Sequence, residues 1–238
     1  MSLGNAIGYL TLARIPARRR VPLVYSLHYF PWIGAAVGSL TVLAFLAANR
    51  FLPNALACLV AVLVPQALMG WDPWRGVTEA VQGRNTHPGH GFHAGFRLNN
   101  RGWILLGLLF VSKWAALMTL PLDWQTRVVF VAPILGMCAR TAAFLIGPSK
   151  GMLLTPLLAQ SRVRAGFLSG FQVFLVFLFP VRIALPMLIV TALTVRWMVN
   201  ARNRRTRGLT LQTASCASEV AEGLVLLMLA LAAPFIAR

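Results

Sequence analysis

Acidic residues are scarce in this sequence, because its 238 residues include only 5 Asp and Glu, against 22 Lys and Arg. Charged residues of either sign make up 11% of the chain, whereas hydrophobic residues make up 58%. A soluble domain of this size leaves much of its surface in water and could not bury so large an apolar share. The composition therefore excludes an ordinary soluble enzyme and predicts a protein whose main solvent is lipid.

Cysteines are also few, and Cys58, Cys138 and Cys216 lie too far apart for a disulfide framework or a paired-thiol metal site. The net charge of +17 could indicate a nucleic-acid partner, but the basic residues stand in short clusters between apolar runs. Such clusters are typical of the cytoplasmic loops of membrane proteins. We therefore expect the lipid bilayer as partner and no nucleic acid, and the sequence leaves a homo-oligomer open.

Apolar runs of membrane-spanning length recur along the chain. About 20 apolar residues cross the hydrocarbon of a bilayer, and runs at 30–48, 51–69, 103–120, 128–146 and 220–236 approach or reach that length. A further stretch, 167–198, is interrupted by Pro180, Arg182 and Pro186, which favours two short helices over one. We predict an all-α integral membrane protein, a bundle of six to seven transmembrane helices that forms a single polytopic domain over residues 1–238.

Positive charge orients this predicted bundle. With seven spans and a cytoplasmic N-terminus, 16 of the 22 Lys and Arg fall on the inner side, whereas six spans would place the last basic cluster outside. The apolar part of residues 1–29 is short and contains Arg14, so it does not read as a signal peptide. We expect this segment to be an interfacial helix on the cytoplasmic leaflet.

One long polar segment, 70–102, is cytoplasmic in this topology and is the expected active-site loop. His87, His90 and His93 in it suggest zinc, for which imidazoles are good ligands. Pro88 and the neighbouring glycines disfavour a helical ligand face, so the default interpretation of this run is a flexible polar loop.

Four of the five acids lie at or just inside the predicted cytoplasmic ends of spans, where a carboxylate must pair with a cation or bind a metal. Asp72 and Glu79 are seven residues apart, and Glu219 and Glu222 are three apart, so each pair would share one face of a helix. Converging carboxylates could hold Mg²⁺ against a diphosphate. The alternative is that each acid neutralises a nearby arginine.

Two cations, Lys113 and Arg140, lie within predicted spans. Intramembrane cations generally face the bundle interior or a watery cavity, so both could bind an anion. Snorkelling or ion pairing is the alternative for each.

Several stretches are informative in both content and order. Residues 9–16 read YLTLARIP, residues 26–34 read SLHYFPWIG, residues 113–117 read KWAAL and residues 132–140 read APILGMCAR. Near the end, RGLT at 207–210 is followed by Thr213 and by EVAE at 219–222. Over nearly the whole chain this series resembles the cobalamin synthase family, also called adenosylcobinamide-GDP ribazoletransferase.

Departures from the family pattern fall on acidic positions. Asp72 and Glu79 match the first and last acids of the family's asp-gly-leu-ala-asp-x-x-asp-gly, but Gly76 stands at the middle one. In the stretch that resembles lys-asp-ser-arg, Asn99 replaces the acid, and Gln212 replaces the aspartate of the last motif. Three fewer carboxylates predict weaker binding of Mg²⁺, because ligand charge largely sets affinity for hard cations.

The resemblance implies an enzyme of cobalamin (vitamin B12) biosynthesis in the bacterial cytoplasmic (inner) membrane. It would join adenosylcobinamide-GDP to α-ribazole or its 5′-phosphate and release GMP, with Mg²⁺ as the implied cofactor. The implied roles are catalysis by Asp72, Glu79 and Arg101, substrate binding by Lys113, Arg140, Asn99 and Asn100, and metal binding by Asp72, Glu79, Glu219 and Glu222.

Two other functions stay open. The lost acids fit a noncatalytic paralogue that keeps the fold and binds corrinoid or nucleotide in the membrane. The intramembrane cations and the proline-broken spans fit a small transporter, although no inverted repeat is visible.

Overall fold

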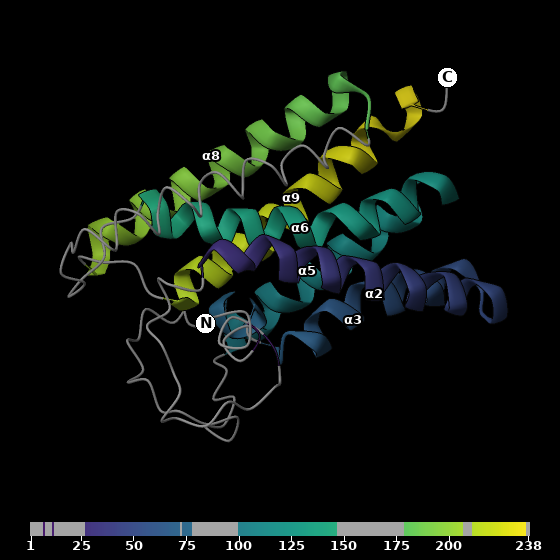
Figure 1. Ribbon diagram of the computed structural model, residues 1–238, viewed down its shortest axis with the longest axis horizontal. Coiled ribbons are helices and arrows are strands. Elements are labelled where there is room, and N and C mark those ends of the chain that lie inside the picture. The colour runs from purple at the N-terminus through teal and green to yellow at the C-terminus, as the bar shows by residue number, and fades with distance from the viewer. Residues whose placement is uncertain are drawn as a thin grey trace.

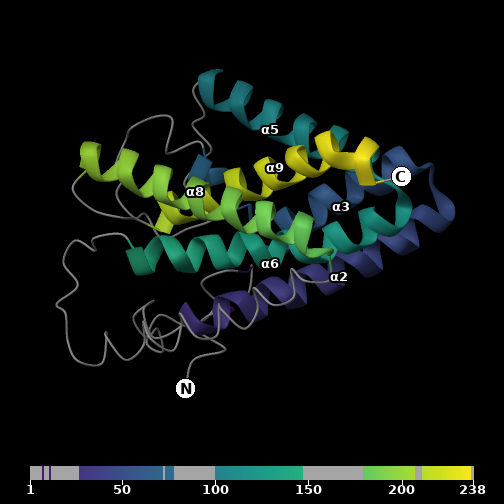
Figure 2. The same ribbon diagram turned by 90° about the horizontal axis from the view of Figure 1, so that it is seen from above.

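The structure is a computed structural model, and it describes residues 7, 11, 27–71, 73–77, 100–146, 179–206 and 211–236. Long helices dominate this part of the chain, and Figures 1 and 2 show them as one bundle. They are α2 (Phe30–Phe51), α3 (Asn54–Leu68), α5 (Asn100–Met118), α6 (Leu122–Ile146), α8 (Val181–Thr206) and α9 (Leu211–Ile236). The predicted all-α membrane bundle is confirmed.

Among the described residues, five helices are long and apolar enough to cross a membrane, compared with the six to seven spans predicted for the whole chain. The helix that falls short is α3, whose 15 residues extend roughly 22 Å. Pro53 precedes its first residue, and a turn at Gly70 ends it, so neither end can be extended. The first half of the stretch 167–198 lies outside the described residues, whereas the second half is the beginning of α8.

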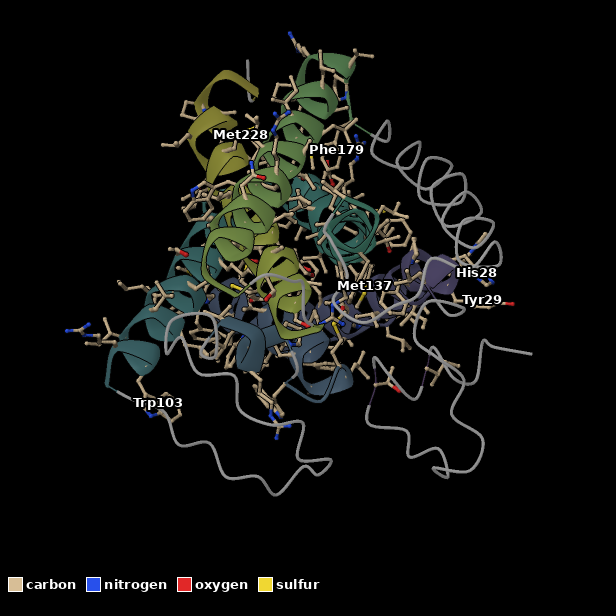
Figure 3. All side chains as sticks on the ribbon, turned by 90° about the vertical axis from the view of Figure 1, so that its left-hand side faces the viewer. His28, Tyr29, Trp103, Met137, Phe179 and Met228 are labelled. Carbon is tan, nitrogen blue, oxygen red and sulfur yellow. The ribbon has the colours of Figure 1, made fainter. Side chains whose placement is uncertain are left out.

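Apolar side chains cover the outside of the bundle. Leu43, Ile104 and Leu231 are 64%, 63% and 78% exposed, whereas Lys113 and Glu219 are 3% and 1% exposed. A soluble protein shows the opposite distribution. Figure 3, an end-on view, shows Trp103 projecting away from the bundle and Met137 toward its interior. Lipid-facing helices that enclose polar groups account for both features.

Close packing between α2 and α6 depends on two glycines. Gly34 and Gly38 are four residues apart, the spacing at which small side chains let membrane helices approach. A Cβ at Gly34 would lie 2.8 Å from the carbonyl oxygen of Pro133, and one at Gly38 would meet that of Phe130. Since later residues of α2 face earlier residues of α6, the two helices are antiparallel.

Helix directions follow from such pairs. Gly136 of α6 contacts Glu222 of α9 and Arg140 contacts Ser215, so α6 and α9 are antiparallel. A short connection joins α8 to α9, which pack together, so α8 runs parallel to α6. Hence one end of the bundle holds the first residues of α2, α5 and α9. The last residues of α3, α6 and α8 lie at the same end (Figure 1). We name it the basic end, because Arg101 lies there.

The predicted interfacial segment, 1–29, lies almost entirely outside the described residues. Ile7 is an exception, since its side chain packs against the cluster of Leu27, Phe30 and Met137 near the basic end. This contact ties one point of the N-terminal segment to α2 and α6, but it does not test the interfacial helix, which stays a prediction.

Candidate functional site

A buried group of ionised side chains joins three helices in the half of the bundle nearer the basic end. The Nζ of Lys113 in α5 donates to Glu219 Oε1 at 2.6 Å and to Glu222 Oε2 at 3.0 Å, both in α9. Glu219 and Glu222 lie one turn apart on the same face of α9, so one ammonium reaches both. We name Lys113, Glu219, Glu222 and Arg140 the charge cluster.

Two uncharged donors complete the surroundings of Glu219. Gln66 Nε2, near the end of α3, donates to Glu219 Oε2 at 2.8 Å. Trp74 Nε1, from the helical turn at 73–77, donates to Glu219 Oε1 at 3.2 Å. Three side chains from separate segments thus hold one carboxylate, which gives a buried anion the partners that it needs in a lipid-embedded interior.

Arg140 brings the second cation to the cluster from α6. It is fully buried, its Nη2 donates to Ser215 Oγ in α9, and it interacts electrostatically with Glu222. Gly136, one turn earlier on α6, lies against the Glu222 carboxylate and Ser218. Two cations and two anions therefore balance one another inside the bundle, which is the arrangement that makes buried charge tolerable.

A tight turn after α3 positions Trp74. Trp71 donates its N–H to Gln66 O at 2.8 Å, and Gly70 donates to Ala67 O at 3.1 Å. This bond pair is the Schellman motif, in which the residue after the cap adopts a left-handed conformation, and Gly70 has φ 64°. Trp71 also has a positive φ, 62°, which is unusual for a bulky residue. After this turn, Trp74 lies within hydrogen-bonding distance of Glu219 in α9.

A small cavity borders the cluster between α3, α5, α6 and α9. Its volume is about 30 Å³, and its wall includes Gln66, Lys113 and Glu222 together with Pro65 and Pro133. The Oε1 of Gln66 is buried there, with no hydrogen-bond partner within the described part of the chain. The cavity has room for about two water molecules. The cavity is therefore too small to hold a nucleotide.

The structure brings four of the predicted site residues together and leaves a fifth apart. Lys113, Arg140, Glu219 and Glu222 form the charge cluster, so ion pairing, one of the two alternatives for Lys113, is what the structure shows. Arg101 is exposed in the first turn of α5, roughly 18 Å along the helix from Lys113. The structure does not describe the remaining predicted site residues. These are Asp72, Glu79, His87, His90 and His93, together with the side chains of Asn99 and Asn100.

Several residues that donate to or accept from the charge cluster were not predicted from the sequence. Gln66 follows Pro65 as the last polar side chain of an otherwise apolar run, which is a usable signal. Ser215 precedes Glu219 by four residues and Glu222 by seven, so the three share one helical face. Nothing in the sequence indicated that Trp74 contacts Glu219, because this contact depends on the turn after α3.

A magnesium ion does not fit the described donors. Within the described residues no three His, Cys, Asp or Glu side chains gather as metal ligands. Both glutamates are bound to the Lys113 ammonium, which would repel a divalent cation. Asp72 and Glu79, the other predicted ligands of Mg²⁺, lie outside the described residues, so a site that uses them stays a prediction.

Comparisons with known proteins give no match, either to a family model, to a curated protein or to a solved structure.

Proposed function

We propose that this protein is a membrane transferase of the cobalamin synthase kind, which transfers the adenosylcobinamide phosphate moiety of adenosylcobinamide-GDP to α-ribazole or its 5′-phosphate. A hydroxyl of the acceptor attacks the corrinoid-bound phosphorus, the bond from this phosphorus to the oxygen of the GMP leaving group breaks, and GMP departs. The proton of the hydroxyl ends on GMP or in solvent. No soluble cofactor needs to be consumed.

One observation carries the proposal. Lys113, Arg140 and Glu219 come from three separate stretches that carry the family resemblance, and Trp74 follows Asp72 in a fourth. These stretches are far apart along the chain, yet their polar residues meet in the charge cluster. Packing alone does not require polar side chains from all four to converge.

The charge cluster acts mainly by positioning. Because its cations and anions balance, it has little net charge to offer a diphosphate. Its hydrogen bonds instead fix α5, α9 and the turn at 73–77 relative to one another. Exposed Arg101 is then a described cation at the basic end that could bind phosphate, which arginine binds in bidentate fashion. Asp72, Glu79, Asn99 and Asn100 would act at the same end.

The proposed location is the bacterial cytoplasmic membrane, with the basic end facing the cytoplasm. Arg75, Arg101 and the run 202–205 belong to this end, whereas Arg50, Arg127 and Arg182 belong to the opposite end. When residues 1–26, 78–99 and 147–178 are added, most of the positive charge lies on one side in the proposed topology, as the positive-inside rule requires.

The direct test is release of GMP from adenosylcobinamide-GDP by the full chain in lipid nanodiscs, with α-ribazole present and with Mg²⁺ either supplied or chelated. GMP that appears only with α-ribazole supports the transferase. Turnover that survives chelation shows that fixed arginines suffice, whereas turnover that requires Mg²⁺ points to Asp72 and Glu79. No GMP under any of these conditions contradicts the proposal.

A noncatalytic membrane paralogue is the second candidate, and a specific observation favours it. Lys113 neutralises both glutamates of α9, and acids of the family pattern are absent at Gly76, Asn99 and Gln212. The variant carrying Gly76→Asp and Gln212→Asp separates the two candidates. A gain of GMP release would indicate an enzyme that has lost ligands, whereas corrinoid-GDP binding without turnover in either form would favour the paralogue.

A further inference from the structure

Two tryptophans and a phenylalanine form an aromatic group beside the charge cluster. The ring centroids of Trp71 and Trp74 are 5.1 Å apart at an interplanar angle of 59°. Those of Trp74 and Phe110 are 5.8 Å apart at 79°, an edge-to-face contact. All three side chains are half-buried. The group therefore has part of its surface packed and part open.

The orientation of this group is fixed from two sides. The N–H of the Trp74 indole is bound to Glu219, which is itself buried and held by Lys113 and Gln66. The backbone of Trp71 is held in a left-handed conformation by its bond to Gln66 O. A bulky residue rarely adopts this conformation, and such strain concentrates at binding sites. The structure thus holds an aromatic surface in one place.

Lipid anchoring alone does not account for these side chains. Tryptophans that anchor a protein at a bilayer surface keep a wet N–H and an apolar ring in lipid. Trp103 and Trp197 fit that description, since they are 55% and 63% exposed on the outside of α5 and α8. Trp74 instead donates its N–H to a buried carboxylate, and it packs between Trp71 and Phe110.

We propose that Trp71 and Trp74 form a stacking subsite for the planar aromatic base of a substrate. Fixed indole rings bind bases through stacking without reading their edges. The backbone N–H of Arg75 is bound to Trp71 O at 3.0 Å, so a residue with a cationic side chain, which could hold the attached phosphate, directly follows Trp74. The proposal rests on the transferase function only for the identity of the base, which is either the guanine of GMP or the base of α-ribazole.

Equilibrium dialysis in nanodiscs tests the subsite without requiring turnover. The probes are GMP, α-ribazole and ribose 5-phosphate, which lacks a base. We expect Trp71→Leu to weaken binding of one base-containing probe about five- to a hundredfold, from the usual strength of one stacked base. Trp71→Phe should restore most of that binding, and ribose 5-phosphate should bind equally to all forms. The probe that responds identifies the base.

Trp103→Leu is the matched control, because it removes an exposed indole far from Glu219, and a thermal melt of each variant confirms that it folds. Equal affinity of Trp71→Leu and the parent chain for both base-containing probes would overturn the subsite, as would an equal loss in Trp103→Leu or no binding of either probe to the parent chain. Base-dependent binding without GMP release would support the subsite while contradicting the transferase. GMP release by Trp71→Leu with an unchanged KM would support the transferase and contradict the subsite.

Discussion

Gly136 of α6 lies directly against the carboxylate of Glu222 in α9. A Cβ placed on Gly136 would come within 2.8 Å of Glu222 Cδ and of Ser218 Oγ, in addition to overlapping a carboxylate oxygen. The two helices therefore approach each other closely at the point where the buried acid must reach Lys113. The missing side chain of Gly136 provides the space in which Glu222 lies.

Gly136→Ala is expected to lower the melting temperature in detergent, because the methyl group must displace the carboxylate or separate the helices. Overpacking of this kind typically costs about 1–3 kcal/mol, which corresponds to a fall in melting temperature of roughly 2–12 °C for a chain of this size. Gly107→Ala is the control, since a Cβ at Gly107 has no neighbour within 4 Å. It should leave the melt unchanged or raise it slightly. Equal effects of the two variants would refute close contact between Gly136 and Glu222.

Lys113→Met should be the most damaging single change in the charge cluster. It leaves two carboxylates buried with no ammonium between them, and loss of one partner of a buried pair costs about 3–5 kcal/mol. Unfolding by a denaturing detergent measures the loss. Arg50→Gln, at an exposed position at the opposite end, should stay within about 0.5 kcal/mol of the parent.

A rescue variant separates charge from shape in this cluster. Adding Glu219→Gln to Lys113→Met removes one anion for the one cation lost, so Glu222 and Arg140 still balance one another and most of the lost stability should return. If the double variant is no more stable than Lys113→Met, the cluster is held by packing rather than by its ion pairs.

Gly38→Ala tests the contact between α2 and α6. The added methyl group would meet the backbone carbonyl of Phe130, which cannot turn aside as a side chain can. We expect a fall in melting temperature comparable to that of Gly136→Ala. Ser39→Ala, next to it on the exposed face, removes only a hydroxyl bound to Ala35 O and should have little effect. A neutral Gly38→Ala would mean that the two helices are farther apart than the structure places them.

Hydropathy located most helices in the sequence, but it failed at polar helix ends. α2 begins at Phe30 as predicted, and α6 finishes at Ile146 as predicted. α9, however, begins at Leu211 rather than at Val220. The extra residues include Ser215 and Glu219, which lower the average hydropathy although they are buried. A helix that presents polar groups to the bundle interior looks too polar to be in the membrane.

The candidate site could also be predicted only in part from the sequence. Scarcity of acids was enough to single out Glu219 and Glu222, because a carboxylate in an apolar chain needs a specific partner. The sequence could not choose between metal and cation for that partner, and it could not place Lys113 across from α9. That pairing depends on how α5 and α9 pack, which a period of 3.6 residues does not encode.

Gly70→Ala should weaken the turn that positions Trp74. A residue with a Cβ in the left-handed conformation costs about 1–2 kcal/mol, and Gly70 has φ 64°. Gly70→Asn is the matched variant, because asparagine tolerates this conformation better. We expect the melting temperature to be highest for the parent chain with Gly70, lower for Gly70→Asn and lowest for Gly70→Ala. If alanine is as stable as glycine, the Schellman motif does not control this turn.

Cysteine labelling tests the proposed orientation. The native Cys58, Cys138 and Cys216 are buried, so a single new thiol at an exposed position should dominate labelling by a membrane-impermeant maleimide. Arg50→Cys, at the end opposite the basic end, should react in intact cells. Arg101→Cys should react only after the membrane is permeabilised. The reverse result would put Arg101 and Trp74 on the outer face, away from cytoplasmic nucleotides, and would contradict the proposed transferase function.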